Sequence, residues 1–283
     1  MPRLGRHASI LGVTEALRIC ALGDLLLDVI VRLRGPIAPD TDTYGSTRVG
    51  AGGQAANVTA WAAALGASAR FLGKRACDGA GRVAAEELAR HGVELRGPEV
   101  ESGTGTVVSL ATPDGRRSML TDRGVATSFA PEELDPRWLE GCDWLHVPGY
   151  SLVSSPLAET TLAAAALAPR VSLDISSTAA VSELGVARFR GLVAELGPVL
   201  VLATEEEAAL VGTIEAETVI VKRGARGCLV RQGDSERAYG ARPAEVVDAT
   251  GAGDAFAAGF LLGGPELALE AAARCVARSG AMP

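Results

Sequence analysis

Short apolar segments alternate along most of this chain with longer segments whose apolar positions recur at helical spacing. The short segments, bounded by glycine, proline and acidic residues, are typical of buried strands, and the longer ones are typical of helices. The first strand is predicted over residues 18–31, where an apolar run contains two aspartates. A glycine-rich loop then leads into a predicted helix over residues 54–65, which ends at Gly66.

The same alternation continues toward the C-terminus. Further strands are predicted over residues 69–72, 142–147, 171–174, 199–202 and 219–222, and further helices over residues 81–91, 156–167 and 205–211. Val246 and Val247 are predicted to end a last strand, which two helices follow. Because strands that alternate with helices form parallel sheets covered on both faces, we expect an α/β fold with a doubly wound, mostly parallel sheet flanked by helices.

A different pattern occurs over residues 103–120, where two extended runs flank the turn sequence Pro-Asp-Gly. This pattern predicts a β-hairpin, and we expect it to form a small side sheet with a strand over residues 41–49. A second hairpin is predicted over residues 228–240. The expected organisation is an N-terminal extension over residues 1–16 and one domain over residues 17–283, with a small β-sheet lid from segments at about 32–50 and 103–122.

Composition and charge exclude several classes of partner. The chain has 283 residues, of which 48% are hydrophobic and 4% aromatic, so the core is expected to be aliphatic. The net charge of −7 and the absence of a basic stripe argue against nucleic acid as a partner. Neither a signal peptide nor a membrane-spanning helix is predicted. The five cysteines are far apart, which suits reduced thiols in a cytoplasmic protein.

The stretch VVDATGAGDAFAAGF, residues 246–260, places small residues where a strand is predicted to give way to a helix. The first N–H groups of a helix lack intrahelical acceptors, and with the helix dipole they would form an anion site around Gly251, Ala252 and Gly253. Asp254 would repel a phosphate bound there unless it had its own task, such as accepting the proton of an attacking hydroxyl. Local chemistry fits an alternative equally well, in which Asp254 caps the helix and the glycines form a tight turn.

Two motifs resemble one known family. The sequence D-A-T-G-A-G-D-A-F-A-A-G-F is similar to the C-terminal signature of the ribokinase-like, PfkB-type carbohydrate kinases, and G-G-Q-A-A-N-V at residues 52–58 is similar to their N-terminal signature. The resemblance covers nearly everything from Cys20 onward. It implies that Asp254 is the catalytic base, that Gly251, Ala252 and Gly253 form the anion hole, and that the γ-phosphate of ATP is transferred to a hydroxymethyl oxygen of a small carbohydrate.

The resemblance also implies a substrate side of the site. Asp28 matches the aspartate that binds sugar hydroxyls in the family, and Gly53 and Asn57 match positions whose backbone and amide contact the substrate. Alternatively, Asp28 lies at an exposed strand end and Asn57 caps a turn. His146 and Tyr150 follow at a strand end and are candidates for the pocket wall, although a packed or surface role fits them equally well.

On the nucleotide side, Lys222 and Gly224 in V-K-R-G-A-R-G match a strand and turn near the phosphates or ribose, and an exposed hairpin is the alternative. The family's Asn-x-x-Glu motif, which organises magnesium and phosphate through water, is imperfect. Thr204 stands where Asn is usual, and Glu207 takes the Glu position. The acidic run at residues 205–207 also suits a plain helix N-terminus.

The resemblance further implies a monovalent cation, K⁺, beside the anion hole. The loop that would hold it contains Asp248 and Thr250. The chain ends soon after Gly280, so we expect the C-terminal part of that cation and adenine site to be altered.

The substrate itself is left open by the motifs, because relatives handle pentoses, ketohexoses, keto-deoxy sugar acids and nucleosides. Three arginines near the lid either read a carboxylate or phosphate or are solvated: Arg116, Arg117 and Arg123. Three aromatic residues are plausible near a pocket, and this small number slightly favours a plain sugar over a nucleoside: Tyr44, Trp144 and Tyr150.

Other function classes have weaker support. No lysine lies in a P-loop context, and the Gly-x-Ser-x-Gly motif of serine hydrolases is absent. The sequence G-A-G-G-Q-A fits a dinucleotide-binding pattern, but its preceding strand is short and it follows a loop rather than the first strand. No acidic residue lies where a second strand should end. The remaining alternatives are a nucleoside kinase of the same fold and a non-catalytic sugar- or nucleotide-sensing module. A homodimer through the lid is expected, because pairing would cover its edge strands.

Overall fold

The computed structural model of the protein describes residues 16–114 and 116–283. Apart from Ala16, the predicted N-terminal extension over residues 1–16 therefore lies outside the described part of the chain.

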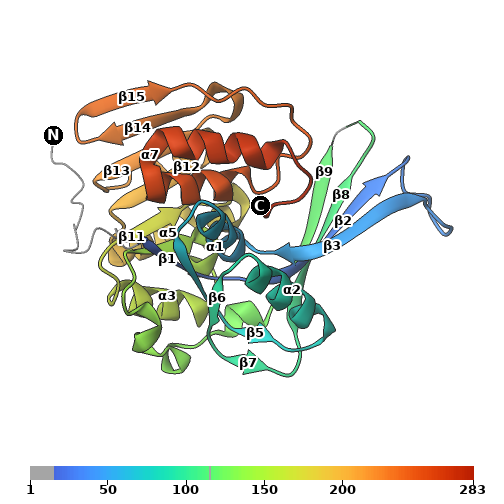
Figure 1. The fold of residues 1–283 in the computed structure, drawn as a ribbon, viewed down its shortest axis with the longest axis horizontal. Coiled ribbons are helices and arrows are strands. Elements are labelled where there is room, and N and C mark those ends of the chain that lie inside the picture. Colours follow the sequence, from blue (N-terminus) through green and yellow to red (C-terminus); the bar gives the residue numbers. More distant parts are fainter. Residues whose placement is uncertain (1–15, 115) are drawn as a thin grey trace.

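A nine-stranded sheet forms the centre of the molecule (Figure 1). Its strands are β1 (Arg18–Leu22), β4 (Ser68–Leu72), β6 (Glu94–Arg96), β10 (Trp144–Pro148), β11 (Val171–Asp174), β12 (Leu200–Thr204), β13 (Thr218–Lys222), β14 (Cys228–Gln232) and β15 (Ser235–Tyr239). They lie in the order β15-β14-β13-β12-β11-β10-β1-β4-β6. All neighbours from β13 to β6 are parallel, and β14 and β15 extend the sheet as the predicted antiparallel hairpin.

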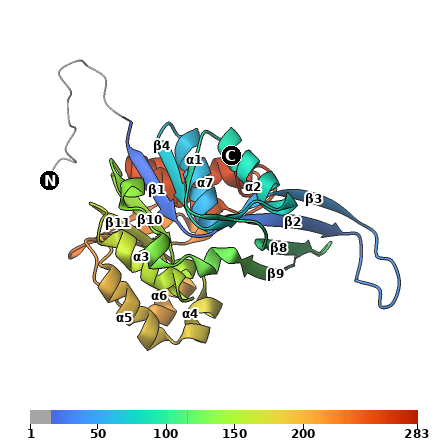
Figure 2. The ribbon, with the colours of Figure 1, turned by 90° about the horizontal axis from the view of Figure 1, so that it is seen from below.

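Helices cover both faces of this sheet, as Figure 2 shows. One face carries α1 (Gln54–Ala64), α2 (Gly79–Arg90) and α7 (Ala252–Val276), and the other carries α3 (Leu157–Ala165), α4 (Thr178–Leu184), α5 (Val186–Leu196) and α6 (Glu205–Val211). Alternate residues of β1 point to opposite faces: Ile19 and Ala21 pack with α1 and α7, and Cys20 and Leu22 pack on the α3 and α5 side. The predicted doubly wound α/β fold is confirmed.

Four of these helices, α1, α2, α3 and α6, correspond to predicted ones, whereas α4 and α5 were not predicted. The two predicted closing helices are present within α7, which is interrupted at Gly264, where φ is +74° and ψ is −161°, and at Pro265. By length and composition alone α7 would be long and apolar enough to cross a membrane. It is instead half buried in this fold and broken near its middle, which is typical of a core helix.

The predicted first strand over residues 18–31 is wrong as one strand. Its first part is β1 of the main sheet, and its second part belongs to β2 (Leu26–Leu33) of a different sheet. The apolar run continues through the change of sheet, so hydrophobicity does not mark the break at residues 23–25. Val246 and Val247 do not end a strand either. Both are exposed, and the Val247 N–H donates to the carbonyl of Val276 at the end of α7 rather than to a strand.

A second sheet of four strands projects from the main body as the lid (Figure 1). Its strands are β2, β3 (Gly45–Gly52), β8 (Thr104–Ala111) and β9 (Arg117–Gly124), in the order β3-β2-β8-β9. The predicted hairpin is the antiparallel pair β8–β9, and β2 separates it from β3. Two short strands, β5 (Arg75–Ala76) and β7 (Glu99–Val100), form a separate pair. The chain therefore enters the lid twice, after β1 and, by way of β7, after β6 of the main sheet, and both passages bring side chains toward the same region.

Candidate active site

Asp254 lies in the first turn of α7, next to α1. The helix begins after Gly251, whose φ of +78° and ψ of −1° form a left-handed conformation that glycine adopts without strain. Asp254 Oδ2 accepts a hydrogen bond of 2.8 Å from Asn57 Nδ2 on α1. The contact between α1 and α7 thus joins the two sequence motifs in one place.

The surroundings of Asp254 change its acidity. Burial raises the pKa of its carboxyl group to about 7, and the nearby charges of Asp174 and Asp24 act in the same direction. The hydrogen bond from Asn57 and the charge of Lys222 oppose this rise. A carboxyl group with a pKa near neutral pH is well matched to accept a proton from an alcohol during reaction.

Lys222 brings a positive charge to the start of α7. Its Nζ lies 2.5 Å from Asp174 Oδ2, and the two residues stand at the carboxyl ends of β13 and β11, the strands on either side of β12. A Cβ built on Gly253 would lie 3.5 Å from this Nζ, so the ammonium group borders the predicted anion hole. Burial alone would lower the pKa of Lys222, but the charges of Asp174, Glu207 and Asp254 outweigh it and raise the pKa. The lysine therefore stays charged beside a helix N-terminus, where a phosphate would be favoured.

Thr204 and Glu207 form a capping box at the start of α6. Thr204 Oγ1 accepts from the Glu207 N–H at 3.2 Å, and Glu207 Oε2 accepts from the Thr204 N–H at 2.7 Å. This is the geometry of the plain helix N-terminus that the sequence left as an alternative. Glu207 is also buried, which raises its pKa together with the charge of Asp174, and it lies near enough to Lys222 to influence its charge. It therefore caps its own helix and borders the same cluster.

On the predicted substrate side, Asn57 has an unused acceptor. The residue is buried, and its Oδ1 has no hydrogen-bond partner among the described residues. Gly53 precedes α1 with a φ of +98°, and a Cβ there would lie 2.4 Å from the Asp24 carbonyl oxygen, so only glycine fits. Because buried acceptors are rarely left unpaired, a ligand hydroxyl is a natural partner for Asn57.

Asp28 lies in β2 of the lid rather than in a strand of the main sheet. Its carboxylate packs against Gly52, where a Cβ would come within 2.1 Å of Asp28 Cγ. Burial raises the pKa of Asp28 to about 6, and the charges of Asp24 and Glu87 add to the effect. Glu87 Oε2 accepts from the Ala51 N–H at 2.7 Å, so carboxylates flank the glycine-rich segment that precedes α1.

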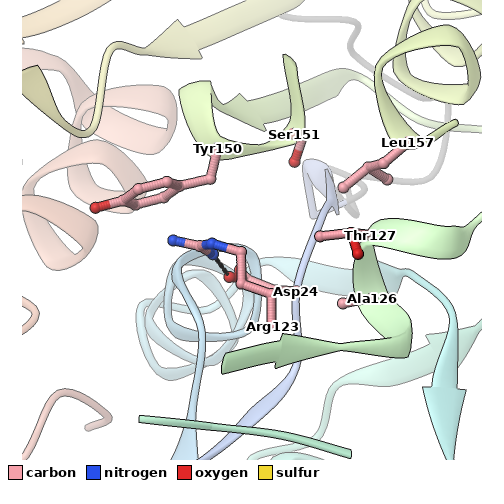
Figure 3. Close-up of a pocket in the computed structure, with 7 residues that line it drawn as sticks. All are labelled: Asp24, Arg123, Ala126, Thr127, Tyr150, Ser151 and Leu157. Carbon is pink, nitrogen blue, oxygen red and sulfur yellow. Dashed lines mark hydrogen bonds and ion pairs between the residues drawn. The ribbon is translucent and has the colours of Figure 1, made fainter. Parts of the chain in front are cut away.

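A pocket lies beside this segment, and Figure 3 shows its lining residues. They are Asp24, Arg123, Ala126, Thr127, Tyr150, Ser151 and Leu157. Arg123 comes from the lid and forms an ion pair with Asp24, and its guanidinium lies 3.7 Å from the centre of the Tyr150 ring. Of the three lid arginines, Arg123 is thus at the pocket. Arg116 is exposed and pairs with Asp114, and the side chain of Arg117 lies outside the described part.

Sequence reasoning did not identify Asp24 or Asp174 as site residues. Asp24 lies in the same apolar run as Asp28. In the structure Asp24 stands between β1 and β2 and Asp28 lies within β2, but the sequence around the two aspartates does not reveal this difference. Asp174 had a usable signal, because it ends a predicted strand, and ligands of parallel sheets bind beyond the carboxyl ends of strands.

Several other candidates lie elsewhere or are packed. His146 is fully buried, with Nδ1 at 3.0 Å from Ser172 Oγ and no described partner for Nε2, and burial lowers its pKa to about 4. Trp144 is at the opposite, amino end of β10, and Tyr44 is exposed on the lid. Gly224 starts a short 3-10 helix with no atoms near the position of a Cβ, so the structure gives no further reason for a contact there.

Asp248 and Thr250 lie in the loop before α7. Asp248 Oδ1 accepts from the Thr250 N–H at 3.0 Å and from its hydroxyl at 2.6 Å. Asp248 Oδ2 accepts from the Gly280 N–H at 3.3 Å. The carboxylate therefore links this loop to the C-terminal segment.

Comparison with known proteins identifies the family. The family model described as "pfkB family carbohydrate kinase" matches residues 16–282. An ATP-dependent ribose-1-phosphate kinase from Halopiger xanaduensis is 30% identical over 280 residues, which is 91% of this chain and 90% of that protein. A fructokinase from Klebsiella pneumoniae is 31% identical over 271 residues, which is 87% of this chain and 84% of that protein.

Solved structures share the fold. An adenosine kinase from Sinorhizobium meliloti superposes with a TM-score of 0.83 at 24% identity, covering 94% of this chain and 96% of that one. A putative ribokinase II from E. coli in complex with ATP and Mg²⁺ gives a TM-score of 0.80 at 21% identity, covering 94% of both chains. With the family match over almost the whole chain, these findings show that the protein belongs to the pfkB family of carbohydrate kinases and is a phosphotransferase that acts on a sugar hydroxyl.

Proposed function

We propose that this kinase transfers the γ-phosphate of ATP to a hydroxymethyl oxygen of a small sugar, with Asp254 as the general base. The observation that carries the proposal is the position of the Asp254 carboxylate. It lies at the start of α7, accepts a hydrogen bond from the Asn57 amide and is close enough to Lys222 to be influenced by its charge, and burial raises its pKa to about 7. Asp254 accepts the proton of the substrate hydroxyl while the oxygen bonds to phosphorus and ADP leaves.

The residues around Asp254 bind the phosphoryl group, the sugar and the nucleotide in this proposal. The amides around Gly251, Ala252 and Gly253 and the ammonium of Lys222 stabilise charge on the transferring phosphoryl group. Asn57 accepts from the substrate through its unpaired Oδ1, and Asp28 and Gly53 contact the sugar from the lid side. Thr204 and Gly224 lie on the nucleotide side, where their contact with ATP rests on the family resemblance.

Magnesium, when bound with the nucleotide, supplies positive charge to the phosphates. Among the described residues no group of three or more His, Cys, Asp and Glu side chains could hold a metal ion. This suits Mg²⁺, which commonly binds through one carboxylate, water and substrate phosphates. Glu207, buried near Lys222, is the carboxylate that we assign to it. A potassium ion beside Asp248 and Thr250 stays a prediction.

The acceptor is more simply a sugar than a nucleoside. The Tyr150 ring at the pocket is covered by the Arg123 guanidinium, which leaves that face unavailable to a nucleobase. A sugar phosphate belongs to the sugar class as well, and the Halopiger relative is named for activity on ribose 1-phosphate.

Two further assignments complete the proposal. A homodimer through the lid is supported by exposed apolar side chains on that sheet, namely Val49, Met119 and Leu120. A cytoplasmic location is supported by the cysteines, which are all unpaired thiols.

The substitution Asp254→Asn tests the reaction, with Asp234→Asn in the exposed β14–β15 turn as the matched control. We expect ATP-dependent phosphorylation of ribose, fructose or a sugar phosphate by the wild type, a loss of kcat of about 10²–10⁴-fold in Asp254→Asn, and no change in Asp234→Asn. Nucleotide binding should persist in both variants. Turnover by Asp254→Asn at the wild-type rate would exclude Asp254 as the base, and the absence of turnover in wild type would favour the sensing module.

A further inference from the structure

Arg123 is placed on the side of the lid that faces the site. In the lid, Asp28 pairs with Val107, and Val107 pairs with Thr121. Because alternate residues of a strand share a face, Arg123 projects from the same face as Thr121 and Asp28. The arginine comes immediately before Gly124, where the lid hairpin ends and the chain returns to the core. It therefore lines the pocket described above, at the boundary between the lid and the core.

Two contacts hold the guanidinium in place without a ligand. Asp24 accepts from Arg123 Nη1, and Asp24 is itself fixed because its Oδ1 accepts from the Gln54 N–H at 3.1 Å. On the other side the guanidinium stacks on the Tyr150 ring, 3.7 Å from its centre. A guanidinium fixed by a carboxylate and an aromatic face loses little conformational entropy when it binds a further group.

The guanidinium also has unused donors. Among the described residues Asp24 is its hydrogen-bond partner, through one of its three nitrogens, and the side chain is 22% exposed. Figure 3 shows the guanidinium between Tyr150 and Asp24, with its nitrogens directed away from Thr127 and Leu157. The edge formed by Nε and Nη2 matches the bidentate geometry in which arginine binds a carboxylate or a phosphate.

The surrounding charges restrict where an anion could bind. Arg123 is the one cation among the seven residues that line the pocket. Asp24, Asp28 and Glu87 lie around the adjacent glycine-rich segment. The charges of Asp24 and Glu87 both raise the pKa of Asp28, so both carboxylates are near Asp28. An anionic group placed beside Asp28 or Glu87 would be repelled, whereas at the Nε–Nη2 edge of Arg123, the edge not used by Asp24, the guanidinium offers both positive charge and hydrogen-bond donors.

We propose, on the basis of the proposed kinase function, that Arg123 is a specificity-determining residue that binds an anionic substituent of the acceptor sugar. The anion, a phosphate or a carboxylate, lies at the Arg123 edge, and the hydroxymethyl group to be phosphorylated is thereby turned toward Asp254. Asp24 and Tyr150 act through Arg123, as positioning residues.

Matched pairs of compounds test this assignment. Binding of D-ribose 1-phosphate is compared with D-ribose, and binding of a 2-keto-3-deoxy sugar acid with D-fructose, by calorimetry in the presence of a non-hydrolysable ATP analogue. We expect wild type to prefer at least one anionic compound over its neutral partner. Arg123→Gln should weaken that binding by about 10- to 100-fold, the range expected for losing hydrogen bonds to a charged group, and should change binding of the neutral sugar by less than about threefold. Arg123→Lys keeps the positive charge but loses the bidentate hydrogen-bonding geometry of the guanidinium, so its affinity for the anionic compound should lie between those of wild type and Arg123→Gln.

The controls separate specificity from damage to the fold. Arg116→Gln removes an exposed arginine from the same hairpin and should change neither class of ligand. Because Arg123→Gln leaves the buried Asp24 unpaired, the double variant Asp24→Asn/Arg123→Gln removes both charges, and it should fold and show the same selective loss.

Each outcome decides the inference. If Arg123→Gln selectively weakens binding of D-ribose 1-phosphate, the substrate is a sugar phosphate. If it selectively weakens binding of the 2-keto-3-deoxy sugar acid, the substrate is a sugar acid. Equal weakening of neutral and anionic ligands, or a wild type that binds the neutral partners at least as tightly, would overturn it. Turnover is measured separately with wild type, so binding that depends on Arg123 without phosphate transfer would refute the kinase mechanism and leave the anion site standing.

Discussion

At the scale of single residues, the site is governed by charges that act on Asp254 in opposite directions. Burial, Asp174 and Asp24 favour the protonated carboxyl group, whereas Asn57 and Lys222 favour the carboxylate. Asn57 therefore has two tasks in the proposed mechanism: its Nδ2 holds the base in the ionised form, and its unpaired Oδ1 is left for the substrate.

This balance predicts how activity depends on pH. The base works only when it is deprotonated, so kcat/KM should be low in acid, rise through about pH 7 and level off above it, since burial raises the pKa of Asp254 to about 7. Asn57→Ala removes a hydrogen bond that lowers this pKa, so the midpoint should move to higher pH, and KM for the sugar should also rise. Rates measured between pH 5 and 9 check both statements. An unchanged midpoint, or one moved to lower pH, would mean that a different group controls the acid limb.

At the scale of elements, the start of α1 depends on backbone geometry that only glycine provides. Gly53 and Gly66 stand at the two ends of this helix with nearly the same φ, +98° and +96°. The two positions differ in the room available for a side chain. A Cβ on Gly53 would lie 2.4 Å from the Asp24 carbonyl oxygen, whereas no atom lies within 4 Å of a Cβ on Gly66. Comparing substitutions of Gly53 and Gly66 therefore distinguishes the cost of an unfavourable backbone conformation, which both share, from the cost of a steric clash, which only Gly53 has.

We expect Gly66→Ala to lower the free energy of unfolding by about 1–2 kcal/mol, the cost of a left-handed conformation for a residue with a side chain. Gly53→Ala should lower it by about 3 kcal/mol or more, because the backbone must also move away from Asp24. Urea unfolding of both variants measures the difference, and equal losses would contradict the steric argument. At temperatures where both are folded, only Gly53→Ala should lose kinase activity, since Gly53 positions the turn that carries Asn57.

At the scale of the whole molecule, the C-terminal segment joins the lid, the helix pair and the loop before α7. Arg48 of the lid donates to the Ser279 carbonyl at 2.9 Å, and Trp61 Nε1 on α1 donates to the Ala281 carbonyl at 2.8 Å. The Gly280 N–H bonds to Asp248, as described above, and a Cβ on Gly251 would meet Ala281 at 2.6 Å. The last residues thus support the loop that forms the predicted anion hole.

Deleting residues 279–283 should therefore reduce both stability and kcat. The loss of the buried Ala281 and Met282 side chains and of their hydrogen bonds should cost about 2–5 kcal/mol. Trp61→Phe removes one of these hydrogen bonds and leaves a cavity at a fully buried site, so it should cost about 2–4 kcal/mol with little effect on kcat. Thermal unfolding and steady-state rates check the pair, and a truncated chain as stable and active as wild type would show that the segment does not support the loop.

The fold could be predicted well where burial alone decides the local pattern. The strand over residues 171–174 and the helix over residues 205–211 have the predicted bounds, because a strand buried on both faces and a helix with an acidic first turn have clear local signatures. The prediction was wrong at residues 18–31, where one apolar run is divided between strands of two sheets. It was also wrong at Val246 and Val247, which are β-branched but belong to no strand. Roles of individual site residues stay predictions that the experiments above test.

The pattern of apolar and polar residues is sufficient to predict the alternation of strands and helices, and with it the doubly wound sheet, because side-chain periodicity reflects burial within one element. The sequence also indicates that Asp254 follows a run of small residues at a helix start, since that arrangement is local. By contrast, the contacts of Asp254 with Asn57, of Lys222 with Asp174 and of Arg123 with Asp24 join residues that are 197, 48 and 99 positions apart, and they become visible only in the folded molecule. Such contacts depend on how sheets and helices pack together, and no local periodicity encodes which distant side chains that packing will join.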